Sequence, residues 1–159
     1  MFIKPDYNLK SIFDIDLEKL KQDGIKGMLF DLDSTLMASK TAVYSQKVLD
    51  WLEIVKKDFF VGVISNNKNK DYIEKVTKIS DFPVLFDAGK PRVKKALAFI
   101  SQNGLNAKDC VFVGDRPLTD VLCGKFMGSK TIMVDSITAD SEAKLVRFVR
   151  FLEKLTVSH

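Results

Sequence analysis

The sequence predicts an α/β fold built on a parallel β-sheet, and two observations lead to this prediction. Short apolar runs alternate with longer amphipathic segments along the chain, which is the order of strand–helix–strand units. The apolar runs are also nearly continuous, as in Val61-Gly62-Val63-Ile64, and this is typical of strands covered by helices on both faces. With 159 residues and no linker or repeat, residues 1–159 are expected to form a single domain.

Five strands are expected, one at each apolar run. Their ranges are Lys26–Asp31, Phe60–Ser65, Val84–Phe86, Cys110–Asp115 and Lys130–Asp135. Residues 1–24 precede the first strand, mix apolar residues with acids and lysines, and end at Asp23-Gly24. We interpret residues 1–24 as an N-terminal extension of the domain.

Helices are expected where apolar residues recur at spacings of three and four. Their ranges are Gln46–Lys57, Lys70–Ile79, Arg92–Asn103, Thr119–Met127 and Asp140–Leu155. Pro91 stands at a plausible first position of the third helix, and Gly104 and Gly128 follow the third and fourth helices. Proline at the start and glycine past the end are typical helix boundaries.

Composition disfavours several classes of protein. No stretch approaches the roughly 18 consecutive apolar residues of a membrane span, and the first residues lack the apolar run of a secretory signal. Cys110 and Cys123 are not in CxxC spacing, which favours two buried thiols in a reducing compartment over a disulfide or a metal site. The net charge of +4 is spread along the chain, which favours an anionic substrate or surface and does not indicate nucleic acid. A cytoplasmic protein is therefore expected.

Polar residues follow four of the five predicted strands. Because the carboxyl ends of the strands in an open α/β sheet face one crevice, these residues are expected to meet. They are Asp31-Leu32-Asp33, Ser65-Asn66-Asn67, Gly89-Lys90-Pro91, and Gly114-Asp115 followed by Asp120. Each segment alone is common in turns and helix caps, but their occurrence in this order indicates a site for a phosphate and a metal ion.

The residue types suit the hydrolysis of a phosphate monoester. The substrate is a dianion, so its charge must be neutralised before a carboxylate can approach it. Asp31 and Asp115 could bind Mg2+ through hard oxygen ligands, and Lys90 adds a fixed positive charge. Ser65 and Asn66, with nearby backbone N–H groups, could hold the phosphate oxygens.

Two carboxylates divide the chemistry in this hypothesis. Asp31 attacks phosphorus and forms an aspartyl-phosphate. Asp33, two residues further on, protonates the leaving alkoxide and later deprotonates the attacking water. Asp120 holds the metal ion or orients Lys90.

The four segments resemble the motifs of the haloacid dehalogenase (HAD) phosphatase superfamily. The similarity lies in Phe30-Asp31-Leu32-Asp33-Ser34-Thr35-Leu36 for its DxDx[TV] signature, Ser65 for its second motif, Lys90 for its third, and Gly114-Asp115 with Asp120 for its fourth. This resemblance implies a three-layer Rossmann-like core with strand order 5-4-1-2-3. It also implies a Mg2+ site formed by Asp31, Asp115 and the backbone carbonyl of Asp33, with Asp120 assisting. Aspartate at position 33 is the phosphatase form, since the family's transport ATPases carry threonine there and its phosphonatases carry alanine.

The chain as a whole resembles the YqeG-like branch of HAD subfamily IIIA. The similarity includes Pro5-Asp6-Tyr7, Ser11-Ile12-Phe13-Asp14-Ile15, Gly24-Ile25-Lys26-Gly27 and Thr119-Asp120-Val121-Leu122. That branch is related to mitochondrial and bacterial phosphatases that act on phosphatidylglycerophosphate. Arg116, Cys123 and Lys125 depart from the branch's pattern beside the site, which leaves the substrate preference open.

Two further features bear on the substrate. One helix and one strand fill most of each interval between Asp33, Ser65 and Lys90, so no cap domain is expected. An open site suits a substrate too large to enclose, such as a protein, a polynucleotide or a lipid headgroup at a membrane. The helix expected over 140–155 has one apolar face and basic residues opposite. Such a helix could lie on an anionic bilayer or cover the sheet with a solvated basic face.

The sequence thus predicts a Mg2+-dependent phosphatase that acts on phosphatidylglycerophosphate, in peripheral contact with the inner face of the membrane. Hydrolysis of soluble sugar phosphates, nucleotides or phosphoproteins would use the same residues. A non-catalytic interaction module is the alternative of another class, but no motif residue is missing. A receiver-type signalling domain is disfavoured because its accepting aspartate follows the third strand, whereas Asp115 follows the fourth.

Overall fold

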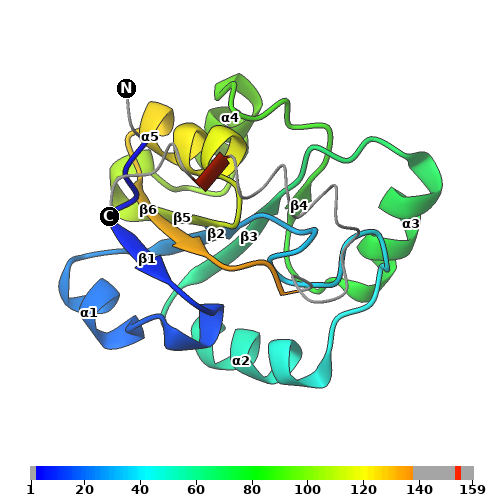
Figure 1. Ribbon diagram of the computed structural model, residues 1–159, viewed down its shortest axis with the longest axis horizontal. Coiled ribbons are helices and arrows are strands. Elements are labelled where there is room, and N and C mark those ends of the chain that lie inside the picture. Colours follow the sequence, from blue (N-terminus) through cyan, green and yellow to red (C-terminus); the bar gives the residue numbers. More distant parts are fainter. Residues whose placement is uncertain (1–2, 138–152, 155–159) are drawn as a thin grey trace.

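A computed structural model describes residues 3–137 and 153–154. Its centre is a parallel β-sheet with helices on both faces (Figure 1). Helices α1 (Leu17–Gln22), α2 (Gln46–Lys56) and α3 (Lys70–Ile79) contribute buried residues to the core on one face. Helices α4 (Lys94–Gln102) and α5 (Leu122–Met127) do so on the other. The expected three-layer α/β architecture is confirmed.

The sheet contains six strands in the described residues, one more than expected. They are β1 (Tyr7–Leu9), β2 (Gly27–Phe30), β3 (Phe60–Ile64), β4 (Val84–Leu85), β5 (Cys110–Gly114) and β6 (Lys130–Val134). Their order is β1-β6-β5-β2-β3-β4, so the order expected for the five predicted strands is confirmed and β2 is central.

The additional strand comes from the N-terminal segment. Tyr7 of β1 lies opposite Ile132 of β6, and the Asp6 carboxylate accepts a hydrogen bond of 2.7 Å from the Thr131 backbone N–H. A three-residue strand at the sheet edge has only one neighbour, so it needs no continuous apolar run. The prediction of five strands was wrong for this reason.

Helix caps explain where α2 and α3 begin. Ser45 accepts a hydrogen bond from the Val48 N–H at 3.2 Å, and Asn69 accepts one from the Tyr72 N–H at 3.1 Å, as N-cap side chains do. Within residues 3–137, three short helical turns accompany these helices: η1 (Ile12–Asp14), η2 (Ala107–Asp109) and η3 (Pro117–Val121), the last being a π-helical turn.

Two predicted helix starts were too early. The third helix was expected from Arg92 with Pro91 at its first position, but α4 begins at Lys94. The Arg92 N–H donates to the Gly89 carbonyl at 3.0 Å, so Pro91 belongs to a turn. The fourth was expected from Thr119, which lies in η3 instead. The helix expected over 140–155 falls on residues outside the described part, except 153–154.

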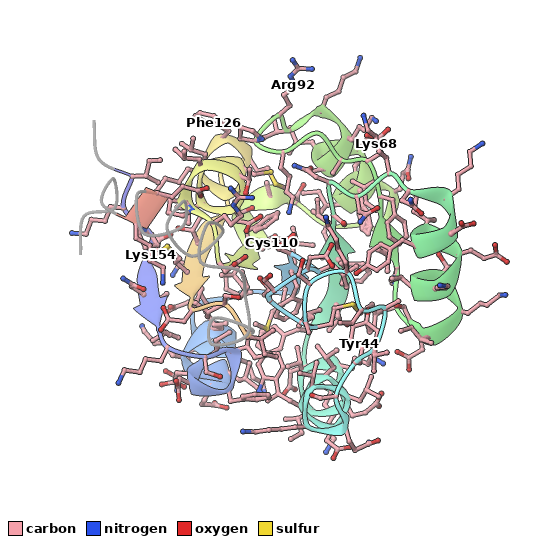
Figure 2. The ribbon with its side chains drawn as sticks, turned by 45° about the vertical axis from the view of Figure 1, so that its right-hand side comes forward. Tyr44, Lys68, Arg92, Cys110, Phe126 and Lys154 are labelled. Atoms are coloured by element: carbon pink, nitrogen blue, oxygen red, sulfur yellow. The ribbon has the colours of Figure 1, made fainter. Side chains whose placement is uncertain are left out.

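The strands alternate their side chains between the two cores. Phe30 faces α2, where it meets Trp51 edge-to-face with ring centroids 5.8 Å apart, whereas Leu29 faces the α4 and α5 side. Cys110 and Cys123 are free and buried, as expected, with Cys110 near the middle of the molecule in Figure 2. Burial raises the pKa of each thiol to about 11.

The motif intervals hold no cap domain. Helix α2 alone lies between β2 and β3, and α3 alone lies between β3 and β4. Within the described residues, the helices are all too short or too polar to cross a membrane.

Candidate active site

The loops that follow β2, β3 and β4 meet at the carboxyl edge of the sheet, together with the segment after β5 that contains the η3 turn. They enclose a pocket of about 200 Å³ to which each of these loops contributes, through Asp31, Ser65, Lys90 and Thr119 among others. Of the strand-end residues named from the sequence, Asp31, Asp33, Ser65, Asn66 and Lys90 line this pocket. Asp115 and Asp120 do not line it but lie close to Asp31.

Lys90 is the centre of the site's electrostatics. Its ammonium Nζ lies 2.7 Å from Asp31 Oδ1 and 2.8 Å from Asp120 Oδ1, and its side chain is only 2% exposed. Burial by itself lowers the pKa of Lys90, but the negative charges of Asp120 and Asp31 outweigh this and hold the pKa above its ordinary value. Lys90 is thus a fixed cation, and its buried charge is compensated by two carboxylates.

The surroundings of Asp31 raise the pKa of its carboxyl towards neutral pH. Burial first, and then the neighbouring Asp120, raise the pKa of Asp31 to about 6, while Lys90 acts in the opposite direction. At pH 7 the carboxylate is therefore mostly ionised. Its backbone N–H continues the strand pairing by donating to the Val113 carbonyl at 2.9 Å.

Three carboxylates form a group that fits a hard divalent cation. One oxygen from each of Asp31, Asp115 and Asp120 lies within 4.8 Å of the others. The Thr35 hydroxyl donates to Asp115 at 3.3 Å, and the Arg116 backbone N–H donates to Asp120 at 3.2 Å. Several oriented oxygen donors and no sulfur or nitrogen ligand are the donor set that Mg2+ prefers.

Asp33 stands apart from this group of three. Its carboxylate accepts hydrogen bonds from the Lys40 backbone N–H at 2.8 Å and from the Tyr72 hydroxyl at 2.5 Å, while it lines the same pocket as Asp31. Sequence reasoning missed Tyr72 as a functional residue because it lies on the apolar face of α3. The one feature that could have indicated a role for Tyr72 was its hydroxyl, because a buried phenol usually forms a hydrogen bond.

The residues that follow β3 form hydrogen bonds that hold the backbone of Lys90 in place. The Asn66 side chain donates to the Lys90 carbonyl at 3.1 Å and accepts from the Lys90 N–H at 2.8 Å. Ser65 Oγ accepts from the Asn67 N–H at 3.1 Å. Ser65 and Asn66 both line the pocket, but both polar ends of Asn66 are committed to the backbone of Lys90.

Arg116 connects the pocket to the C-terminal part of the chain. It lines the pocket and its guanidinium forms an ion pair with the buried carboxylate of Glu153. This contact could not be predicted from the sequence, because the partners are 37 residues apart and belong to no common motif.

Gly114 allows Asp120 to approach the end of β5. A Cβ added to Gly114 would lie 2.4 Å from three atoms of Asp120, so Gly114→Ala must displace this carboxylate from Lys90. We expect it to destabilise the protein by about 1–3 kcal/mol, measured by urea unfolding. Gly62→Ala is the matched control in another strand, since its Cβ would lie 2.8 Å from the ring of Phe60 and not against a residue of the site. Equal losses in both variants would contradict a specific role for the Asp120 contact.

Comparisons with known proteins agree with this architecture. Residues 1–138 match the family described as mitochondrial PGP phosphatase. The chain is 33% identical to the probable phosphatase YqeG of Bacillus subtilis (strain 168), over 99% of this chain and 91% of that protein. It is 29% identical to phosphatidylglycerophosphate phosphatase 1, chloroplastic/mitochondrial, of Arabidopsis thaliana, over 96% of this chain but only 46% of that longer protein.

Solved structures share the fold at low sequence identity. A predicted HAD-like family hydrolase from Porphyromonas gingivalis superposes with a TM-score of 0.58 at 13% identity, covering 81% of this chain and 98% of that one. A HAD family enzyme from Bacteroides thetaiotaomicron, a magnesium complex, gives a TM-score of 0.54 at 14% identity, covering 79% and 98%. Family, relatives and fold agree: the chain belongs to the mitochondrial PGP phosphatase family, and it is a phosphatase with the HAD fold.

Proposed function

We propose that this phosphatase hydrolyses the terminal phosphate monoester of phosphatidylglycerophosphate, using Mg2+ and an aspartyl-phosphate formed on Asp31. The observation that carries the proposal is the buried Lys90 bridging Asp31 and Asp120 beside Asp115. This arrangement places a fixed ammonium beside the carboxylate nucleophile, next to three carboxylates that could hold the Mg2+ needed to neutralise a dianionic phosphate.

Asp31 is the nucleophile in this proposal. One of its oxygens contacts Lys90, which leaves the other to attack phosphorus as the bond from phosphorus to the leaving oxygen breaks. Lys90 offsets the repulsion between the carboxylate and the incoming dianion. Ser65 and Asn66 also line the pocket and are proposed to hold the phosphate oxygens, Ser65 through its hydroxyl and Asn66 through its backbone N–H, because the Asn66 side chain is bonded to the backbone of Lys90.

Asp33 is the acid and base. It protonates the leaving alkoxide, and then takes a proton from the water that attacks the aspartyl-phosphate. Tyr72 and the Lys40 N–H fix the position of its carboxylate, so the proton is delivered from one defined side of the pocket.

The metal-binding residues are proposed to be Asp31, Asp115 and the backbone carbonyl of Asp33, with Asp120 assisting. Bound Mg2+ supplies charge neutralisation of the phosphate. Asp120 has a second role here, because it also contacts the ammonium of Lys90 at 2.8 Å.

Two observations favour the lipid substrate over soluble esters. The family is described as mitochondrial PGP phosphatase, and the Arabidopsis relative is described as phosphatidylglycerophosphate phosphatase 1. The intervals between the motifs also hold no cap domain, since α2 and α3 alone occupy them. A lipid headgroup would be reached at a bilayer surface, so we propose peripheral contact with the inner face of the membrane.

The test is phosphate release from vesicles that contain phosphatidylglycerophosphate, with p-nitrophenyl phosphate and a panel of soluble sugar phosphates and nucleotides beside them. We expect the lipid to be hydrolysed with a kcat/KM at least about 100-fold above that of any soluble ester, and EDTA to abolish the activity. Turnover of soluble esters alone would exclude the lipid while keeping the phosphatase chemistry.

Tyr72 is expected to act as a positioning residue for Asp33. Tyr72→Phe removes one hydrogen bond to the carboxylate and should lower kcat for p-nitrophenyl phosphate about 10-fold, with KM changed less than about twofold. Tyr44→Phe is the matched control, because it removes a hydroxyl bonded to Ser80 instead. Equal kcat values in the two variants would assign Tyr72 a purely structural role.

A further inference from the structure

A second and larger pocket adjoins the candidate active site. It has a volume of about 530 Å³ and lies against the N-terminal turn of α3, where Lys40, Asn67, Lys68, Asn69, Tyr72 and Lys75 line it. We name it the α3 pocket. It shares Lys40 and Asn67 with the pocket around Asp31, so the two pockets are adjacent.

We propose that the α3 pocket binds a second anionic group of the substrate, namely the phosphodiester carried by the leaving alcohol. The proposal rests on the proposed function and adds to it the recognition of the part of the substrate that is not hydrolysed. It assigns substrate specificity to residues outside the HAD motifs.

The charge of the α3 pocket suits an anion. Lys40, Lys68 and Lys75 line it against the single acidic residue Asp71, and none of these three lysines forms an ion pair with another residue in the described ranges. Lys78, also on α3, is by contrast paired with Glu74 at 3.2 Å. An anion entering the pocket therefore need not displace an existing partner of these lysines.

Backbone and amide donors add to this charge. Helix α3 begins at the pocket after its N-cap Asn69, and the N-terminus of a helix carries unpaired N–H groups and partial positive charge. The Asn67 side-chain oxygen accepts from the Asn69 N–H at 2.9 Å. Its amino group donates to no residue within 3–137 or 153–154, and so is available to a ligand.

The position of the leaving alcohol connects the two pockets. Asp33 protonates the leaving oxygen in the proposed mechanism, so the leaving alcohol must lie on the Asp33 side of the phosphorus. On that side Asp33 contacts Lys40 and Tyr72, and both of these residues line the α3 pocket. In this proposal the leaving alcohol passes Asp33 and continues into the α3 pocket. Its phosphodiester then lies beside Lys40, Lys68 and Lys75.

The test compares two soluble monoesters that differ in the phosphodiester. Glycerophosphoglycerophosphate, the deacylated form of the lipid, carries it, and glycerol 3-phosphate does not. We expect wild-type kcat/KM to be at least about 10-fold higher for the first, mainly through KM. In Lys68→Gln/Lys75→Gln this ratio should fall to within about threefold of one, whereas Lys78→Gln should keep the wild-type ratio.

Competition provides a second measurement that needs no hydrolysis of the probe. Glycerophosphoglycerol keeps the phosphodiester but has no monoester. It should inhibit the hydrolysis of p-nitrophenyl phosphate competitively in the wild type, with an inhibition constant raised about 10-fold or more in the double lysine variant.

Three results would overturn the proposal, and each has its own meaning. If the wild type hydrolyses both substrates with a kcat/KM ratio near one, the α3 pocket does not bind the phosphodiester. The proposed phosphatase function is then unaffected. A lysine effect seen with lipid vesicles but not with the soluble pair would assign the lysines to the bilayer surface. No turnover of any monoester in the presence of Mg2+ would contradict the proposed function itself, and the phosphodiester site with it.

Discussion

Lys90→Met is expected to destabilise the Mg2+-free protein by about 3–5 kcal/mol. The side chain is 2% exposed and holds Asp31 and Asp120 at 2.7 and 2.8 Å, so the variant leaves two buried like charges without their common partner. Chemical denaturation in EDTA measures the loss. Lys95→Met is the control, because Lys95 is exposed and lies 3.6 Å from Asp87, and its loss should stay below about 1 kcal/mol.

The loss of unfolding free energy in Lys90→Met should depend on pH, and the direction of this dependence can be predicted. Burial and Asp120 already raise the pKa of Asp31 to about 6, and removal of Lys90 raises it further. A carboxyl whose pKa is higher in the folded than in the unfolded state favours folding at low pH and loses that contribution as pH rises through the folded pKa. The difference from wild type should therefore shrink as pH falls from about 8 to 5. A deficit that is constant over this range would show that lost packing, rather than charge, is its cause.

The position of the site could be predicted from the sequence because parallel strands share one edge. Asp31, Lys90 and Asp115 each follow an apolar run, and the strand order places β2 between β3 and β5. Once strand ends meet, their polar residues meet too, whatever the details of the loops. The grouping of Asp31, Asp115 and Asp120 within 4.8 Å follows from this rule together with the short η3 turn.

The contacts that refine the site could not be predicted in the same way. Tyr72 reaches Asp33 from α3, 39 residues away, and Arg116 reaches Glu153 across 37 residues. Such pairs depend on the angle at which a helix or a loop packs on the sheet, and no local pattern in the sequence encodes that angle. The edge strand β1 was missed for a related reason, because its three residues are stabilised by pairing with β6 rather than by their own apolarity.

Asp31→Asn is expected to abolish phosphate release, with a loss in kcat of at least about 10⁴-fold. An amide oxygen is a far weaker nucleophile than a carboxylate and cannot form the aspartyl-phosphate. The substitution is nearly isosteric, and the amide oxygen can still accept the hydrogen bond from Lys90 that the carboxylate accepts at 2.7 Å. Repulsion from Asp120, which contributes to the raised pKa of Asp31, is also removed. The variant should therefore be at least as stable as wild type in EDTA.

This combination separates a nucleophile from a structural aspartate. Asp120→Asn is the matched comparison, because Asp120 contacts the same lysine at 2.8 Å but does not attack phosphorus in the proposed mechanism. Acid quenching of the reaction with labelled p-nitrophenyl phosphate should trap a phosphorylated protein in wild type, in reduced amount in Asp120→Asn, and not at all in Asp31→Asn. Residual activity of Asp31→Asn within about tenfold of wild type would assign the nucleophile to another group. Loss of both activity and stability would instead mean that Asp31 serves mainly to compensate the buried charge of Lys90.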